Sequence, residues 1–156
     1  MSVNRVREYL KAWGLDGRIL EFPVSSATVE LAAAAAKVEP PRIAKTLSFK
    51  SDDGCVLVVA AGDARIDNAK YKECFQRKAR MLAPDEAIAL TGHAVGGVCP
   101  FALPEGVRVC LDRSLRRFET VFPAAGSAAS AVELSCEELE QCTRGEWVDV
   151  CKIAER

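Results

Sequence analysis

The sequence predicts an α+β protein built on a mixed and strongly curved β-sheet. Three observations lead to this class. Segments with helical and with strand periodicity follow one another without a regular βαβ rhythm. Hairpin turns are frequent, as at SDDG, residues 51–54. The run CVLVVAA at 55–61 is almost entirely apolar, which indicates a central strand covered on both faces.

Length and composition fit one ordinary domain spanning residues 1–156. Apolar residues make up 49% and charged residues 28%, which excludes a disordered or collagen-like chain. The 21 lysines and arginines nearly balance 22 acidic residues, so any RNA contact would need a local basic patch. No apolar run approaches the roughly 20 residues that cross a bilayer, and no signal-peptide pattern is present. We therefore expect a cytoplasmic protein without membrane contact.

The first elements are helix, strand and helix. Apolar residues at helical spacing from Val3 to Trp13 predict an amphipathic helix that Gly14 ends. RILEF at 18–22 predicts a short strand. Thr28 is the expected N-cap of an alanine-rich helix that the prolines at 40–41 end.

The next strand, residues 44–50, carries a lysine on its apolar side. Alternate residues of a strand share a face, so Lys45 points the same way as Leu47 and Phe49. An ammonium group on an apolar face is normally kept only if it has a partner or a function. The alternative is a lysine at the strand end whose amine reaches water.

The most basic segment follows the central strand. Asp67 is the expected N-cap of a helix that reaches about Ala79. Such a charged run is most often a solvated helix face, and it is also the best candidate in this chain for contacts with phosphates. Its lysines include Lys70, Lys72 and Lys78.

The loop TGHAVGGVCPFALP, residues 91–104, has the composition of a binding loop. It is long, nearly uncharged, and contains three glycines, two prolines and the only histidine. Gly96 and Gly97 let the backbone approach a ligand with its N–H groups, and Pro100 stiffens the far end. The alternative is a well-packed turn that needs glycine for steric reasons.

The remaining elements are short. RSLRRF at 113–118 predicts a turn or short helix carrying Arg116 and Arg117. Ser135 and Glu138 form a capping box. Further strands are expected at 80–82, 107–112, 120–122, 130–135 and 147–151, and further helices from Pro84 and from Ser135 to about Thr143.

Seven cysteines without a C-x-x-C pair, together with a single histidine, predict reduced thiols that are mostly in the core. We expect neither a metal site nor a cofactor. Cys99 and His93 also suggest a thiol hydrolase. The valine and proline beside Cys99 instead indicate an apolar filling role.

Four motifs in a fixed order resemble the YbaK family, the stand-alone aminoacyl-tRNA deacylases related to the editing domain of bacterial prolyl-tRNA synthetases. The motifs are IAKTLSF, GHAVGGVCPFALP, VRVCLD and AAGSAASAVELS. Each motif alone is weak, whereas the ordered set is specific and extends from about Leu20 to the end.

The resemblance implies a barrel-like sheet with surrounding helices, and hydrolysis of the ester that joins a wrong amino acid to tRNA, commonly tRNA(Pro). The essential lysine of the family corresponds to Lys45, and its G-x-x-x-P loop corresponds to residues 96–100. The implied partners are the aminoacylated end of tRNA and prolyl-tRNA synthetase.

The expected catalytic residues are therefore Lys45, Gly96 and Gly97. Loop N–H groups would stabilise the oxyanion, Lys45 would hold a phosphate or the aminoacyl group, and the resemblance implies that a ribose hydroxyl assists the water. The expected substrate contacts are Phe22, Thr46, His93, Val98, Cys99, Pro100 and Phe101. The expected contacts with the tRNA backbone are Lys70, Lys72, Lys78, Arg116 and Arg117.

Two positions depart from the family pattern. Ala131 stands where YbaK has an aspartate, and Cys99 stands where it has a serine. Both changes make the pocket less polar, so alanine, serine, threonine and cysteine all stay open as the amino acid removed. A rival hypothesis is a non-catalytic module that binds aminoacyl-tRNA or a synthetase.

Overall fold

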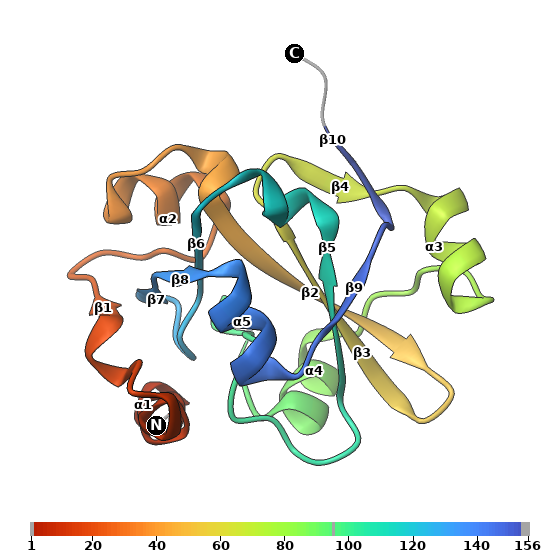
Figure 1. Ribbon diagram of the computed structural model, residues 1–156. Coiled ribbons are helices and arrows are strands. Elements are labelled where there is room, and N and C mark those ends of the chain that lie inside the picture. Colours follow the sequence, from red (N-terminus) through yellow and green to blue (C-terminus); the bar gives the residue numbers. More distant parts are fainter. Residues whose placement is uncertain (1, 95, 154–156) are drawn as a thin grey trace.

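The computed structural model describes residues 2–94 and 96–153 and has the predicted α+β fold (Figure 1). Its main sheet has six strands in the order β8-β6-β2-β3-β5-β9 and curls into half of a barrel. The sheet is mixed: β3 pairs with β2 antiparallel and with β5 parallel. Its strands are β2 (Ile43–Ser51), β3 (Gly54–Ala61), β5 (Arg108–Asp112), β6 (Thr120–Pro123), β8 (Leu134–Ser135) and β9 (Glu146–Val148).

Two small antiparallel pairs stand beside the main sheet. One joins β1 (Ile19–Glu21) to β7 (Ser130–Val132), and the other joins β4 (Ala64–Ile66) to β10 (Cys151–Ile153). The helices are α1 (Ser2–Leu10), α2 (Val29–Ala36), α3 (Asn68–Phe75), α4 (Pro84–Thr91) and α5 (Cys136–Thr143). The described residues also form four short 3-10 turns: η1 (Lys11–Trp13), η2 (Asp16–Arg18), η3 (Pro40–Arg42) and η4 (Arg113–Arg117).

The predicted central strand is the centre of the core. Every residue of β3 after Gly54 is buried, as its continuous apolar run requires. Against the β2–β3 hairpin, Phe49 packs on Tyr71, which in turn packs on Phe75, with ring centroids 5.0 and 4.6 Å apart. These contacts fix α3 to the sheet.

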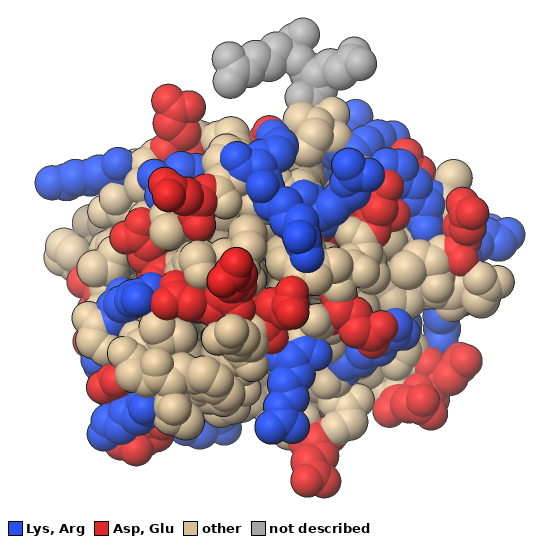
Figure 2. All heavy atoms as spheres, in the orientation of Figure 1, with Lys and Arg blue, Asp and Glu red and all other residues tan. Residues whose placement is uncertain are grey.

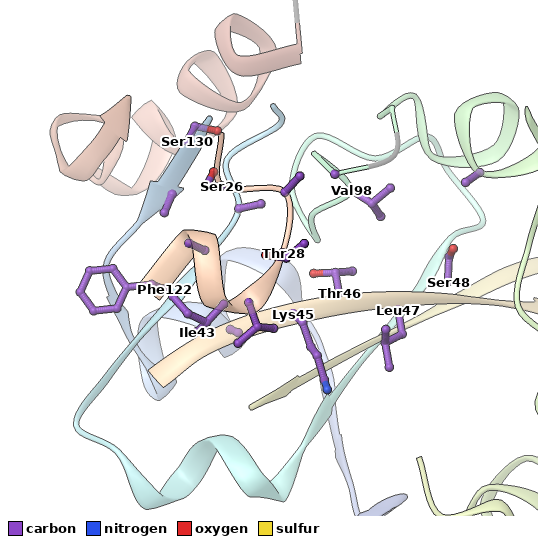
Figure 3. Close-up of a pocket in the computed structure, with 18 of the residues that line it drawn as sticks. Ser26, Thr28, Ile43, Lys45, Thr46, Leu47, Ser48, Val98, Phe122 and Ser130 are labelled. Atoms are coloured by element: carbon purple, nitrogen blue, oxygen red, sulfur yellow. The ribbon is translucent and has the colours of Figure 1, made fainter. Parts of the chain in front are cut away.

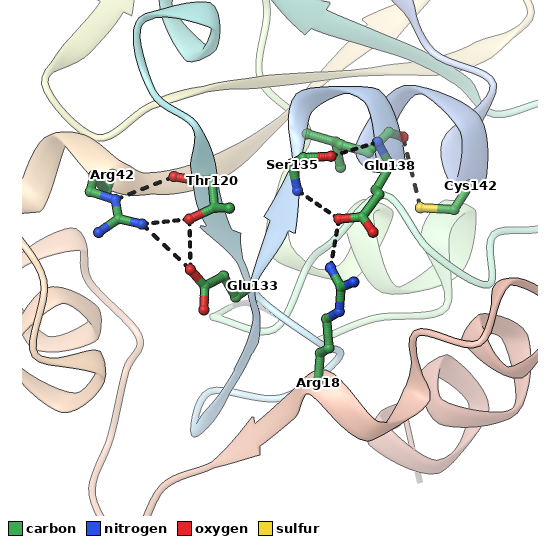
Figure 4. A network of polar contacts seen from close by, with 8 residues as sticks. Arg18, Arg42, Thr120, Glu133, Ser135, Glu138 and Cys142 are labelled. Atoms are coloured by element: carbon green, nitrogen blue, oxygen red, sulfur yellow. Dashed lines mark hydrogen bonds and ion pairs between the residues drawn. The ribbon is translucent and has the colours of Figure 1, made fainter.

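The predicted helix starts are confirmed. The side chains of Thr28 and Asp67 accept hydrogen bonds from the first turns of α2 and α3. Ser135 and Glu138 form the capping box of α5, and Arg18 binds the same Glu138 carboxylate at 2.6 Å (Figure 4).

Several predicted boundaries are wrong. The helix that begins after Asp67 ends at Phe75 because Gln76 adopts a left-handed conformation, with φ at 62°. The predicted strand 80–82 is reduced to one bridge between Met81 and Phe49. The predicted strands 130–135 and 147–151 are each divided in two, because their halves pair with different strands. Strand β4 was not expected.

Within residues 2–94 and 96–153, no helix is both long and apolar enough to cross a bilayer. All seven cysteines are free thiols, and five of them are buried, as predicted.

Candidate active site

A cavity of about 370 Å³ lies between the start of α2, strand β2 and the Gly-rich loop (Figure 3). Its walls are largely apolar, and no aspartate or glutamate lines it among the described residues. Small side chains leave room within it: the lining includes Ala27, Ala32, Ala44, Ala87, Ala124 and Ala131. The size and lining are typical of a site that encloses part of a small-molecule or nucleotide group.

Backbone hydrogen bonds bring the three walls together. The N–H groups of Phe22 and Ser26 donate to the carbonyls of Ala129 and Ala128, at 2.8 and 2.6 Å, which lays the segment before α2 along the segment before β7. The Gly-rich loop packs on both segments. A methyl group on Gly97 would lie 2.8 Å from the Ser127 backbone, so only glycine allows this approach.

Two hydroxyl groups at the cavity have no hydrogen-bond partner among the described residues. Oγ1 of Thr46 and Oγ of Ser26 are buried, and neither makes a hydrogen bond to the described part of the chain. In Figure 3, Thr46 and Ser48 leave β2 toward Thr28 and Val98. Because buried polar groups in proteins are nearly always paired, these hydroxyls indicate where a ligand or water binds. Thr46 was predicted from the sequence, whereas Ser26 was missed, since only the fold shows that its hydroxyl is unpaired.

Lys45 lines the same cavity, but its side chain leaves β2 on the face opposite Thr46, together with Leu47 (Figure 3). This is the face that strand alternation predicts. The side chain is half-buried, and the described residues give its ammonium neither a hydrogen bond nor an ion pair. Burial lowers the pKa of Lys45, while Cys151, Asp63 and Glu30 act in the opposite direction.

The Gly-rich loop presents only part of its predicted donor set. Gly96 and Val98 line the cavity, and no intramolecular hydrogen bond of the described residues engages their N–H groups. The N–H of Gly97 instead donates to Ala94 at 2.9 Å. Gly97 therefore serves the packing of the loop. Val95 lies outside the described residues.

Three predicted substrate contacts lie inside the protein and do not line the cavity. His93, Cys99 and Phe101 have no exposed surface, and Nε2 of His93 lies 2.8 Å from the Phe101 carbonyl. A carbonyl only accepts, so this nitrogen carries the proton. It cannot also take one from the Cys99 thiol, 3.5 Å away, and burial raises the pKa of that thiol to about 12. The thiol-hydrolase alternative is therefore not supported.

Phe22 and Pro100 also lie outside the lining of this cavity. Phe22 packs on the cluster formed by α2, β2 and β6. Pro100 lines a second cavity, of about 390 Å³, next to Tyr9 and Arg144.

The predicted tRNA-binding residues fall into two groups. Three are engaged within the protein: Lys70 with Asp149 at 3.0 Å, Arg117 with Asp63 at 3.0 Å, and Arg116 over the Trp147 ring at 4.0 Å. The other two, Lys72 and Lys78, are exposed and have no ion pair with a described residue. On the face shown in Figure 2, basic side chains gather over η4 and the β4–β10 pair, with acidic side chains between and below them.

Comparison with known proteins agrees with the fold and the motifs. Residues 24–142 match the model of the aminoacyl-tRNA editing domain. The chain is 51% identical over 154 residues to the uncharacterized protein YwhH of Bacillus subtilis (strain 168), covering 97% of this chain and 98% of that protein. It is 34% identical over 90 residues to proline–tRNA ligase of Lysinibacillus sphaericus (strain C3-41), covering 57% of this chain and 16% of that enzyme.

A solved structure shares the whole architecture. It is described as a proposed trans-editing enzyme for prolyl tRNA synthetase, and it superimposes with a TM-score of 0.88 at 29% identity, covering 97% of both chains. A small α+β domain with a curled sheet is thus the architecture in common. The chain belongs to the aminoacyl-tRNA editing domain family.

Proposed function

We propose that this chain, as one editing domain over residues 1–156, is a trans-editing deacylase. It hydrolyses the ester of a mischarged tRNA, tRNA(Pro) carrying a small amino acid: alanine, serine, threonine or cysteine. The observation that carries the proposal is the cavity that Lys45, Thr46, Gly96 and Val98 line together in a member of this family. We place the reaction in the cytoplasm, where aminoacylated tRNA is used.

In the proposed reaction, a water oxygen attacks the ester carbonyl and the bond to the ribose oxygen breaks. One proton of the water passes to the leaving ribose oxygen, and the amino acid is released with a free carboxyl group. Negative charge develops on the carbonyl oxygen during the attack. The N–H groups of Gly96 and Val98 stabilise this charge, because a rigid loop holds them in place before the reaction begins. The neighbouring ribose hydroxyl assists the water.

Side chains of β2 and of the segment before α2 orient the substrate. The hydroxyls of Thr46 and Ser26 donate to, or accept from, polar atoms of the bound aminoacyl-adenosine. Lys45 holds a phosphate or the aminoacyl group at the rim of the cavity through its positively charged side chain. Lys72 and Lys78 contact the tRNA backbone.

A non-catalytic module that binds aminoacyl-tRNA or a synthetase is the rival proposal. It shares the cavity and the cations with the deacylase, and it differs only in turnover.

The test is a deacylation panel with alanyl-, seryl-, threonyl- and cysteinyl-tRNA(Pro), run with the wild type and Lys45→Ala. The deacylase proposal expects hydrolysis of at least one substrate, and a loss of about a hundredfold or more in Lys45→Ala with unchanged thermal unfolding. Lys152→Ala, which removes an exposed lysine of β10, is the matched control and should keep full activity. Tight binding without hydrolysis of any substrate would favour the binding module.

A further inference from the structure

The buried side chain of His93 joins the two ends of the Gly-rich loop. The loop leaves α4 after Thr91 and returns to the core at Phe101, and the imidazole of His93 spans this gap through the 2.8 Å hydrogen bond to the Phe101 carbonyl. Both residues are fully buried. Between them lie Gly96 and Val98, which line the cavity. The bond therefore ties the two ends of the segment whose middle faces the site.

The entry of the loop is held at two further points. The hydroxyl of Thr91, itself fully buried, donates to the Ala87 carbonyl at 2.6 Å and accepts the N–H of His93 at 3.1 Å. On the outer side, Nη2 of Arg5 in α1 donates to the Gly92 carbonyl at 2.9 Å. Gly92 has a φ of +79°, which favours glycine, and a methyl group there would lie 2.6 Å from the guanidinium, so the Arg5 side chain would have to shift.

Helix α1 contributes to this arrangement although it precedes residues 24–142, which match the family model. Arg5 is thus a contact from outside the matched region to the loop of the editing domain.

We infer that His93 is a positioning residue that holds the loop amides of Gly96 and Val98 in the orientation that the reaction needs. Arg5 stabilises the same loop from the surface. This inference rests on the proposed deacylase function. An oxyanion donor that moves by about 1 Å loses much of its effect on the rate, whereas the apolar cavity would still enclose the substrate. Loss of the His93 bond should therefore lower kcat more than it raises KM.

The test compares His93→Leu with His93→Gln. Leucine fills the space without a donor, and glutamine places an amide N–H near the position of Nε2. We expect kcat for deacylation of mischarged tRNA to fall about tenfold or more in His93→Leu with KM within about twofold, and to recover in His93→Gln. A folded His93→Leu with unchanged kcat, or a folded His93→Gln as impaired as His93→Leu, would overturn the inference.

Arg5 allows a second measurement, which does not require a substitution at a buried position. Arg5→Met should lower kcat severalfold. Arg7→Met is the control on the same helix: it removes an exposed ion pair with Glu21 of β1 and should leave kcat unchanged. Equal effects of the two substitutions would contradict the role of Arg5.

NMR spectra of the amides separate this inference from the proposed function. If the wild type hydrolyses no mischarged tRNA, the deacylase proposal fails. The positioning role would still predict that the amide signals of Gly96 and Val98 shift or broaden in His93→Leu and return in His93→Gln. Unperturbed loop amides in His93→Leu would overturn it.

Discussion

Thr46 shows how a single buried hydroxyl without a hydrogen-bond partner in the described part of the chain can reveal a binding site. Its hydroxyl is buried at the cavity without a partner among the described residues. Folding therefore gains no hydrogen bond to the described part of the protein from this group. The hydroxyl stays available to a ligand.

Thr46→Val should therefore separate stability from function. We expect the free energy of unfolding to stay unchanged or rise by up to about 1 kcal/mol, while kcat/KM for deacylation falls about tenfold. The matched control is Thr143→Val. Thr143 is paired with Leu139 and Gly145 outside the cavity, so its loss should lower stability and leave activity intact. Urea unfolding and deacylation assays check both, and a destabilised Thr46→Val would argue against an unpaired hydroxyl.

His93 predicts a pH dependence of stability. Burial lowers the pKa of its imidazole below the ordinary 6.5, and Arg5 lowers this pKa further, whereas the hydrogen bond to the Phe101 carbonyl raises it. The thiol of Cys99 also faces the ring and stays neutral. The unfolded chain therefore binds a proton at a higher pH than the folded chain. The contribution of His93 to stability is complete above about pH 6.5 and decreases as the pH falls toward the lowered pKa.

The slope that His93 adds in this range is at most about 1.4 kcal/mol per pH unit. Urea unfolding between pH 7.5 and 5 should show it in the wild type and not in His93→Gln, because the chain has no other histidine. A wild type whose stability does not change with pH in this range would contradict the lowered pKa.

At the scale of elements, the site depends on how closely the Gly-rich loop approaches the segment before β7. Gly97 has almost no space for a side chain, since a methyl group would meet the Cα and N atoms of Ser127 at 2.8 Å. Backbone atoms cannot rotate away as a side chain can, so the loop itself would have to move.

Gly97→Ala should therefore destabilise the protein by about 1–3 kcal/mol and strongly reduce deacylation, since the loop carries Gly96 and Val98 to the cavity. Gly17→Ala is the matched control, because nothing lies within 4 Å of a methyl group at that position. Thermal unfolding and the deacylation assay measure the two effects. A Gly97→Ala variant as stable as Gly17→Ala would show that the loop has more freedom than this packing implies.

Across the molecule, the cations differ in how available they are to a polyanion. The net charge of −1 gives no general attraction to RNA, so binding depends on individual lysines and arginines. Lys70, Arg116 and Arg117 already contact groups of the protein, whereas Lys72 and Lys78 form no ion pair with the described residues.

Lys78→Gln should consequently weaken tRNA binding and reduce the slope of log Kd against log salt by about one. Lys70→Gln is the matched control, because it removes the same single positive charge. Its ammonium is held by Asp149 and by the Cys151 carbonyl, so the slope should change little. Binding titrations from low to moderate salt measure the slope, and equal changes in both variants would show that the internal contacts of Lys70 do not compete with RNA.

The elements of the chain were largely predictable because their signals are local. Thr28, Asp67 and Ser135 cap helices through hydrogen bonds to residues two or three positions away, and the apolar run at 55–61 is a central strand wherever it lies. The predicted site residues fall into two groups. Lys45, Thr46, Gly96 and Val98 line one cavity, whereas Gly97, His93, Cys99 and Phe101 lie behind it.

Local patterns in the chain are enough to predict the α+β class, most helix and strand positions, the cap residues and the face of β2 on which Lys45 lies. Each of these features depends on neighbours within a few positions. The folded chain is needed to see which hydroxyls lack a partner among the described residues, which cations already contact the protein, and why the strands at 130–135 and 147–151 divide. These depend on partners far away along the chain, such as the Asp112 carboxylate that accepts the N–H of Val150 at 2.9 Å between β9 and β10. A local pattern holds no information about such partners, since burial and pairing arise only when the whole sheet has formed.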